Sequence, residues 1–311
     1  MRKGDRITVI ALGLAAICGA CGRPREPQPA PRAEPVLVWG RRGEEDGNFI
    51  KPRAAAADRS GRLYVVDMSG RIQRFGLDGR HELTWRMPER DRGFPTGLGW
   101  DTRSGTLLVA ETHRACVSRY SADGALLGEW GREGSGPGEF IYPTDVAAGP
   151  DGRVYVTEYG QSARVMVFDE QGRFLKQWGG LGMARGQLQR PMGLDVDARG
   201  TVYVADSCNH RIQVFDSEGN WVCSWGEAGE APGQLKYPWD VSVAPDGSLV
   251  VCEYGNNRIQ KFRPDGTSLG VWGRAGREVG CLASPWGAAL GPGRRVVVVD
   301  ALNHRLQVIQ F

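Results

Sequence analysis

The chain has 311 residues, of which 41% are apolar and 24% charged, and its formal net charge is +3. This composition is typical of a globular protein and excludes wholesale disorder, and the near-neutral charge argues against a nucleic-acid-binding surface. The 45 glycines follow no collagen-like period and therefore indicate many tight turns.

Residues 1–20 are predicted to be a signal peptide of the lipoprotein type. A basic start precedes a mostly apolar run over residues 7–17. This run is shorter than the ~20 residues that cross a bilayer and is typical of a secretory signal. Small residues precede Cys21, which resembles a bacterial lipidation site. An ordinary cleaved signal with incidental cysteines is the alternative.

Residues 21–35 contain five prolines and no apolar face, which predicts an extended tether. We therefore expect an exported protein that is anchored at the cell envelope by a lipid on Cys21, with no other membrane contact. Gly22 stands where an Asp commonly retains lipoproteins in the inner membrane. This favours the outer membrane, on its periplasmic or surface side, if the cell is Gram-negative.

Two landmarks recur along the rest of the chain with the same period. One is a tryptophan that returns every 45 to 48 residues, at Trp39, Trp85, Trp130, Trp178, Trp225 and Trp272. The other is an acidic residue that ends an apolar run, at Asp67, Glu111, Glu158, Asp206, Glu253 and Asp300. Two independent landmarks with one period identify an internal repeat.

Each repeat predicts four short strands. In the fourth repeat, segments 191–196 and 201–206 flank a turn at Gly200. Segment 211–215 then alternates polar and apolar residues, and the last strand ends at Trp225. Four-stranded units of this length, repeated radially, are typical of a β-propeller.

The ends of the chain predict how the ring closes. The sixth repeat stops at Phe311 without a fourth strand, whereas residues 36–40 form a fourth strand with no repeat before it. Joining the two removes an exposed strand edge. We therefore predict an all-β fold, a six-bladed β-propeller over residues 36–311, in which residues 36–40 complete the last blade.

Several segments resemble the NHL repeat. The resemblance is carried by residues 134–140 (GSGPGEF), 204–206 (VAD), 209–215 (NHRIQVF) and 303–305 (NHR). It covers residues 36–311 and implies a six-bladed propeller of the bacterial exported lipoprotein type. NHL propellers serve as binding platforms, as sensor domains and, in fewer cases, as enzymes, so the resemblance implies a fold more specifically than a function.

An arginine follows most of the recurring acids by four to six residues. The pairs are Asp67 with Arg71, Glu158 with Arg164, Asp206 with Arg211, Glu253 with Arg258, and Asp300 with Arg305. In the second repeat Cys116 stands where the arginine is expected. Because a catalytic residue is usually needed only once, this repetition predicts structural ion pairs.

Metal-dependent catalysis has few candidate ligands. His113, His210 and His304 lie in loops of alternate repeats that are expected away from the axis, and the family resemblance implies a structural role for them. Peptidylhydroxyglycine lyases are NHL propellers, and their pattern implies zinc-binding histidines just after the inner-strand prolines. The residues at those positions here are Arg53, Thr96, Thr144, Met192, Trp239 and Trp286.

A lactonase-like enzyme would need calcium held by carboxylates of the channel, for which Asp145 and Asp240 are the only two candidates. Two carboxylates are too few for such a site. We therefore expect neither a catalytic residue nor a cofactor.

The clearest binding signal lies where inner strands are expected to enter the channel. Trp239 and Trp286 each follow the proline that begins such a strand, and Arg53 is their equivalent in the next repeat. Tyr159 and Tyr254 open neighbouring loops on the same face. This arrangement predicts a ligand with an apolar or sugar face and an anionic end. The alternative is that the two tryptophans fill the channel as packing.

We interpret the protein as a non-catalytic binding or scaffold module whose partner is an envelope protein, peptide or glycan. It is expected to be a monomer and to bind no nucleic acid. The alternative is an exported propeller enzyme, lyase-like or lactonase-like, that uses a metal in the channel. An exported protein can also oxidise its cysteines, and Cys208 with Cys252 is the best candidate disulfide.

Overall fold

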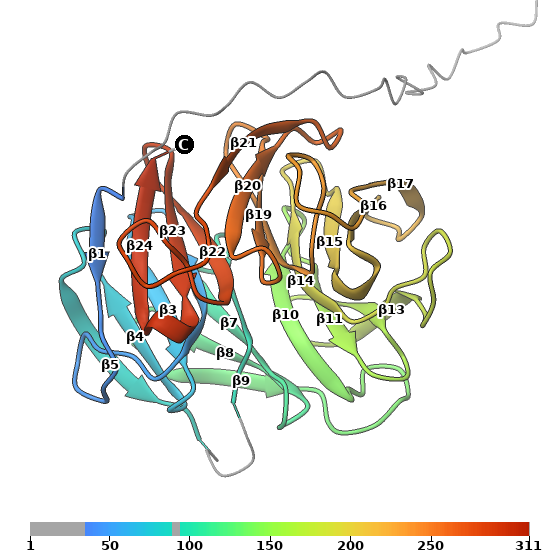
Figure 1. Ribbon diagram of the computed structural model, residues 1–311. Helices are drawn as coiled ribbons and strands as arrows, with labels where there is room; N and C mark the ends of the chain where they lie inside the picture. The colour runs from blue at the N-terminus through green and yellow to red at the C-terminus, as the bar shows by residue number, and fades with distance from the viewer. Residues whose placement is uncertain (1–34, 89–93, 311) are drawn as a thin grey trace, which may run out of the picture.

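The computed structural model describes residues 35–88 and 94–310. Within them, six four-stranded sheets form a ring, and the predicted all-β, six-bladed propeller is confirmed (Figure 1). The predicted signal peptide, Cys21 and the tether up to residue 34 lie outside the described residues. No helix in the described ranges is both long and apolar enough to cross a membrane.

Each blade runs in sequence order from the channel to the rim. Blade 1 consists of β2 (Pro52–Ala57), β3 (Leu63–Asp67), β4 (Arg71–Phe75) and β5 (His81–Arg86). Blade 2 consists of β6 (Gly97–Asp101), β7 (Thr106–Glu111), β8 (Cys116–Ser121) and β9 (Leu126–Trp130). Blade 3 consists of β10 (Tyr142–Ala148), β11 (Val154–Tyr159), β12 (Arg164–Phe168) and β13 (Phe174–Gly179). Blade 4 consists of β14 (Pro191–Val196), β15 (Val202–Asp206), β16 (Arg211–Phe215) and β17 (Trp221–Trp225). Blade 5 consists of β18 (Pro238–Val243), β19 (Leu249–Glu253), β20 (Arg258–Phe262) and β21 (Ser268–Trp272).

Blade 6 is assembled from both ends of the described chain. It contains β22 (Pro285–Gly291), β23 (Arg295–Asp300), β24 (Arg305–Gln310) and, as its outer strand, β1 (Leu37–Trp39). Strand β1 pairs antiparallel with β24, so that Leu37 faces Val308 and Trp39 faces Leu306. The predicted closure is therefore confirmed, and the edge of β24 is covered.

Two short 3-10 turns are the helical elements of the described residues, η2 (Ser207–Asn209) and η3 (Ala301–Asn303). Each precedes a histidine with left-handed backbone, His210 and His304. Nδ1 of His210 accepts a hydrogen bond from the Tyr237 amide, and that of His304 from the Lys51 amide, both at 3.1 Å. Each histidine thus joins its blade to the next one, which is a structural role.

Five of the recurring tryptophans pack against a glycine turn of the next blade, and Trp272 lacks this contact among the described residues because the outer strand of blade 6 is β1. A Cβ added to Gly124 would lie 2.7 Å from Trp85, and one added to Gly219 would lie 2.5 Å from Trp178. Because these turn glycines also have positive φ, no other residue fits there without strain. The recurring tryptophans and the turn glycines of the sequence therefore form one repeated contact between neighbouring blades.

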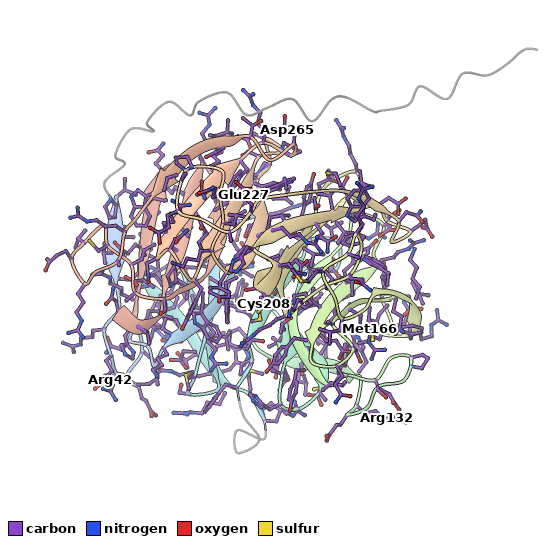
Figure 2. The ribbon with its side chains drawn as sticks, turned by 45° about the vertical axis from the view of Figure 1, so that its right-hand side comes forward. Arg42, Arg132, Met166, Cys208, Glu227 and Asp265 are labelled. Atoms are coloured by element: carbon purple, nitrogen blue, oxygen red, sulfur yellow. The ribbon has the colours of Figure 1, made fainter. Side chains whose placement is uncertain are left out.

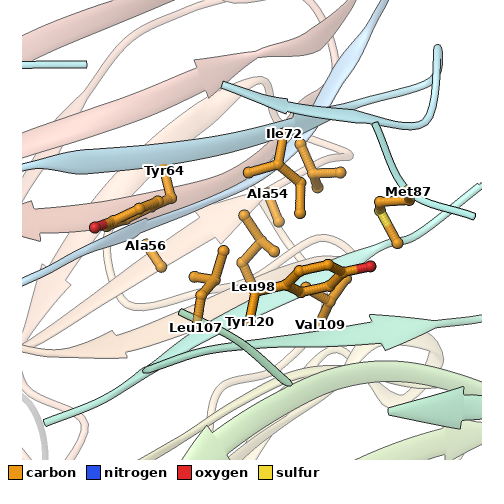
Figure 3. Packing of buried hydrophobic residues seen from close by; sticks show 10 residues of the cluster. Ala54, Ala56, Tyr64, Ile72, Met87, Leu98, Leu107, Val109 and Tyr120 are labelled. Atoms are coloured by element: carbon orange, nitrogen blue, oxygen red, sulfur yellow. The ribbon is translucent and has the colours of Figure 1, made fainter. Parts of the chain in front are cut away.

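The hydrophobic core lies between blades rather than at the centre of the ring. Between blades 1 and 2, Tyr64 and Ile72 meet Leu98, Leu107 and Tyr120 (Figure 3). Equivalent clusters fill the other five junctions. The axis of the ring is consequently left for a channel.

The recurring acids fix the loops that lead from one blade to the next. In blade 4, Asp206 accepts hydrogen bonds from the Gln189 amide and from Arg211, whose Nε lies 2.7 Å away. Nη2 of Arg211 in turn donates to the carbonyls of Ala184 and Gln187 in the preceding loop. The same ion pair occurs between Asp67 and Arg71, Glu158 and Arg164, Glu253 and Arg258, and Asp300 and Arg305. These pairs hold backbone in place and leave little of either charge accessible. On the same connecting loops, the exposed side chains of Arg42 and Arg132 project from the rim (Figure 2).

The five described cysteines are all free thiols, so the predicted pairing of Cys208 with Cys252 is wrong in this structure. Cys252 is fully buried in the cluster between blades 5 and 6. Cys208 instead lies on η2, which is a surface turn of blade 4 (Figure 2). Similar height in adjacent blades therefore did not bring the two sulfur atoms together.

Candidate functional site

A cavity of about 460 Å³ occupies the channel and is lined by all six inner strands. Arg53, Trp239 and Trp286 stand at one end of it. Asp58 and Pro245 stand at the other end. This cavity is the site where a small ligand could contact several blades at once.

The channel wall is built from small residues because the inner strands approach each other closely. A Cβ added to Gly97 would lie 2.4 Å from the Cα of Asp145, and one added to Gly193 would lie 2.6 Å from the Cα of Asp240. Real side chains do not tolerate such distances, so glycine is required beside each of these aspartates. Glycine and aspartate thereby alternate at this position from blade 2 to blade 6, whereas blade 1 carries Ala54.

Three aspartates of the inner strands line the channel, and each binds the backbone of the following blade. The Oδ2 atoms of Asp145, Asp195 and Asp240 accept hydrogen bonds from the amides of Leu194 at 3.0 Å, Val243 at 2.7 Å and Ala288 at 2.9 Å. Asp145 and Asp240 were candidates from the sequence, whereas Asp195 was not. It lies two residues further along its inner strand, where the other blades carry Ala, Gly or Ser.

Burial raises the pKa of all three carboxyls. It raises the pKa of Asp195 to about 6, and that of Asp240 to about 7 with an added contribution from the charge of Asp195. The pKa of Asp145 lies well above its usual range, through burial and then through the neighbouring Asp240. Near neutral pH the channel therefore holds carboxyl groups that exchange protons.

The channel residues do not fit a calcium site. Calcium takes about six to eight oxygen ligands, and each channel aspartate already uses one oxygen for a backbone amide. Neither Asn nor Glu lines the cavity. Among the described residues, no three His, Cys, Asp or Glu side chains in the channel bring their ligand atoms within 4.8 Å of one another.

One cluster outside the channel does meet that distance, and it lies in blade 2, the blade without the usual arginine. It contains Glu111, Cys116 and Glu129. Arg114 binds both carboxylates, at 2.9 Å and 2.7 Å, and the Ser118 hydroxyl lies within hydrogen-bond distance of both and can donate to either. The cluster is therefore an ion-pair network in which Arg114 replaces the arginine found in the other blades.

The channel mouth carries a stacked group of aromatic and cationic side chains. The indoles of Trp239 and Trp286 lie 5.5 Å apart between ring centroids. The guanidinium of Arg53 lies over Trp286 at 4.4 Å. Burial lowers the pKa of Arg53 to about 10, an effect that the nearby Tyr159 phenol opposes, so the side chain remains charged at neutral pH.

These contacts continue around the mouth and return to their start, with at least one residue from every blade. We call this closed series the mouth ring. Its contacts are Arg53–Phe94, Phe94–His113, His113–Tyr142, Tyr142–Tyr159, Tyr159–Arg190, Arg190–Trp239, Trp239–Trp286 and Trp286–Arg53.

The ring includes most of the predicted site residues and several that the sequence did not suggest. Arg53, Trp239 and Trp286 line the cavity, and Tyr159 belongs to the ring above it. Tyr254 stacks on Trp239 at 4.6 Å from outside the ring. The additional members are Phe94, His113, Tyr142 and Arg190. Three of these, Phe94, Tyr142 and Arg190, directly precede an inner-strand proline, which was the signal that could have identified them.

The two arginines of the ring carry charge that the described protein does not neutralise. Nε of Arg53 is buried and has no hydrogen-bond partner among the described residues. Neither Arg53 nor Arg190 forms an ion pair with a carboxylate in residues 35–88 and 94–310. Both guanidiniums instead lie against aromatic faces, which leaves their N–H groups available to an anion.

Comparison with known proteins identifies two family models along the chain. The model described as "SMP-30/Gluconolactonase/LRE-like region" matches residues 54–287, and the NHL repeat matches residues 282–309. No curated protein sequence matches the chain.

Solved structures with a similar fold include one described as "Streptogramin B lyase structure". It has a TM-score of 0.61 and 15% identity, over 88% of this chain and 97% of that one. Another is the virginiamycin B lyase from Staphylococcus aureus, with a TM-score of 0.60 and 14% identity, over 88% of this chain and 94% of that one. At these identities the likeness concerns the fold.

Proposed function

The chain belongs to the SMP-30/gluconolactonase/LRE-like family, and we propose that its propeller binds an anionic ligand with a flat apolar part at the mouth ring. The observation that carries the proposal is Arg53, a partly buried guanidinium that is stacked on Trp286 and lacks a carboxylate partner among the described residues. A buried charge without a partner is costly to the protein, and a ligand carboxylate would relieve that cost.

The aromatic residues supply the other half of the site. Trp239 and Trp286 are both partly exposed and adjacent, so they offer a continuous apolar face beside the charge. Stacking on such a face contributes beyond the burial of its area. We propose that the ligand belongs to an envelope peptide or glycan, since export and anchoring through Cys21 would place the mouth ring there.

The proposal is tested with 2-naphthoate, a flat aromatic monoanion, by calorimetric titration into the purified domain. Arg53→Gln should weaken binding about tenfold or more, because a charge-assisted hydrogen bond is lost. A matched control exists on the rim, where Arg185 lies over Trp221 at 5.0 Å. Arg185→Gln should leave the affinity unchanged, and equal effects of the two substitutions would refute the site.

A second candidate function is catalysis inside the channel, which the pKa values of Asp195 and Asp240 favour. Carboxyls that titrate near neutral pH are suited to general acid and base chemistry. Two solved structures of similar fold are described as lyases of streptogramin B or virginiamycin B, and the family model names a gluconolactonase. Incubation with gluconolactone and with virginiamycin B, beside Asp195→Asn and Asp240→Asn, tests this candidate. Turnover that both substitutions abolish would support catalysis.

A further inference from the structure

Arg190, whose side chain is exposed where that of Arg53 is partly buried, gives the mouth ring a second cationic position. Its guanidinium lies between two rings from the neighbouring blades, Tyr159 at 5.3 Å and Trp239 at 5.2 Å. It directly precedes Pro191, the first residue of β14, in blade 4. Arg53 belongs to blade 1, so two blades lie between the two arginines in either direction around the ring.

The two arginines also flank the tryptophan pair along one arc of the ring. Arg53 lies 4.4 Å from Trp286, the two indoles are 5.5 Å apart, and Trp239 lies 5.2 Å from Arg190. A molecule lying along the two indoles therefore meets a guanidinium at each end. Neither guanidinium is neutralised by a carboxylate of the described residues.

From this symmetry we infer that the ligand class is a dianion, a flat apolar body with one anionic group for Arg53 and another for Arg190. This inference rests on the proposed function and specifies its ligand. A monoanion would engage one arginine and leave the other without a partner. Two anionic groups separated by an aromatic or otherwise flat spacer use both arginines and the apolar face between them.

The loop geometry explains why this position is available for recognition. Arg190 has a left-handed backbone with a φ of 54°, as do Lys51, Tyr237 and Ser284 before their own inner-strand prolines. The conformation is therefore shared by blades 1, 4, 5 and 6, and the identity of the side chain varies among them. In blade 4 that side chain is an arginine, whose planar fork matches a carboxylate.

The test compares each dicarboxylate with its monocarboxylate in two series of different length. The first pair is naphthalene-2,6-dicarboxylate with 2-naphthoate, and the second is biphenyl-4,4′-dicarboxylate with biphenyl-4-carboxylate. Two identical carboxylates already give a twofold statistical advantage. We expect at least one dicarboxylate to bind more than fivefold tighter than its monocarboxylate, because the second contact is charge-assisted.

The variants separate this inference from the proposed function. Arg190→Gln should reduce the advantage of the dicarboxylate over its monocarboxylate to the statistical factor, so that it weakens the dicarboxylate more than the monocarboxylate. Arg185→Gln should preserve the advantage. If the monocarboxylates bind in an Arg53-dependent manner but neither dicarboxylate gains, the dianion inference is overturned and the proposed function stands. If Arg53→Gln has no effect on either series, the proposed function itself fails.

Discussion

Removal of the closing strand should destabilise the whole ring. Deletion of residues 36–40 removes Leu37 and Trp39, which pack against the core cluster between blades 6 and 1. Trp39 lies 5.9 Å from Phe75 between ring centroids and covers Gly79. Loss of a buried tryptophan costs about 3–5 kcal/mol and loss of a buried leucine about 1.5–3 kcal/mol, and both side chains here are half-buried.

We therefore expect the loss of these two side chains to lower the free energy of unfolding by about 2–4 kcal/mol, a sizeable part of the ~5–15 kcal/mol of a typical domain. Strand β24 would also be left with an unpaired edge, which promotes aggregation. Urea denaturation and light scattering measure the two effects. Val36→Ser is the matched control, because this side chain is 58% exposed and should contribute less than about 0.5 kcal/mol. An unchanged midpoint without aggregation in the deletion variant would refute the role assigned to β1.

Three further predictions concern the ion pairs, the channel carboxyls and the N-terminus. Arg211→Met should destabilise the fold by about 3 kcal/mol in urea denaturation, because the Asp206 carboxylate stays buried without its cation. The raised pKa of Asp240 means that the folded state binds this proton more tightly than the unfolded state, so stability should fall as pH rises from about 4 to about 7. Asp240→Asn should flatten that fall in thermal melts, and an unaltered pH profile would contradict the assignment. Cys21→Ser should release the protein from membranes in fractionation, and mass spectrometry showing an unmodified N-terminus in the wild type would contradict lipidation.

The repeat could be predicted from the sequence because its signals are local. The tryptophan and the turn glycine of the next blade, such as Trp85 and Gly124, recur 39 to 42 residues apart in the chain and form one contact. The acid and arginine that brace each loop, such as Asp206 and Arg211, likewise lie within a few residues of each other. Strand order, blade number and ring closure follow from these short-range regularities.

The site was only partly predictable because it depends on contacts between non-equivalent positions of different blades. Trp239 and Trp286 were recognisable, since both follow an inner-strand proline. Arg190 precedes such a proline, and only the structure shows that it reaches Tyr159 in one blade and Trp239 in another. The raised pKa of Asp195 also depends on how closely the inner strands approach, which no local pattern encodes.

The central claim is that Trp239 and Trp286 form a ligand-binding face rather than a plug of the channel. The most direct measurement determines the free energy of unfolding and the affinity for 2-naphthoate on the same Trp239→Ala/Trp286→Ala double variant. We predict that the affinity falls more than tenfold while the free energy of unfolding falls by no more than about 3–5 kcal/mol in total, half the cost of two fully buried tryptophans, because both indoles are partly exposed. If the two tryptophans only plug the channel, the free energy of unfolding falls by about 3–5 kcal/mol for each of them, and the molecules that remain folded keep the wild-type affinity. That result would contradict the account.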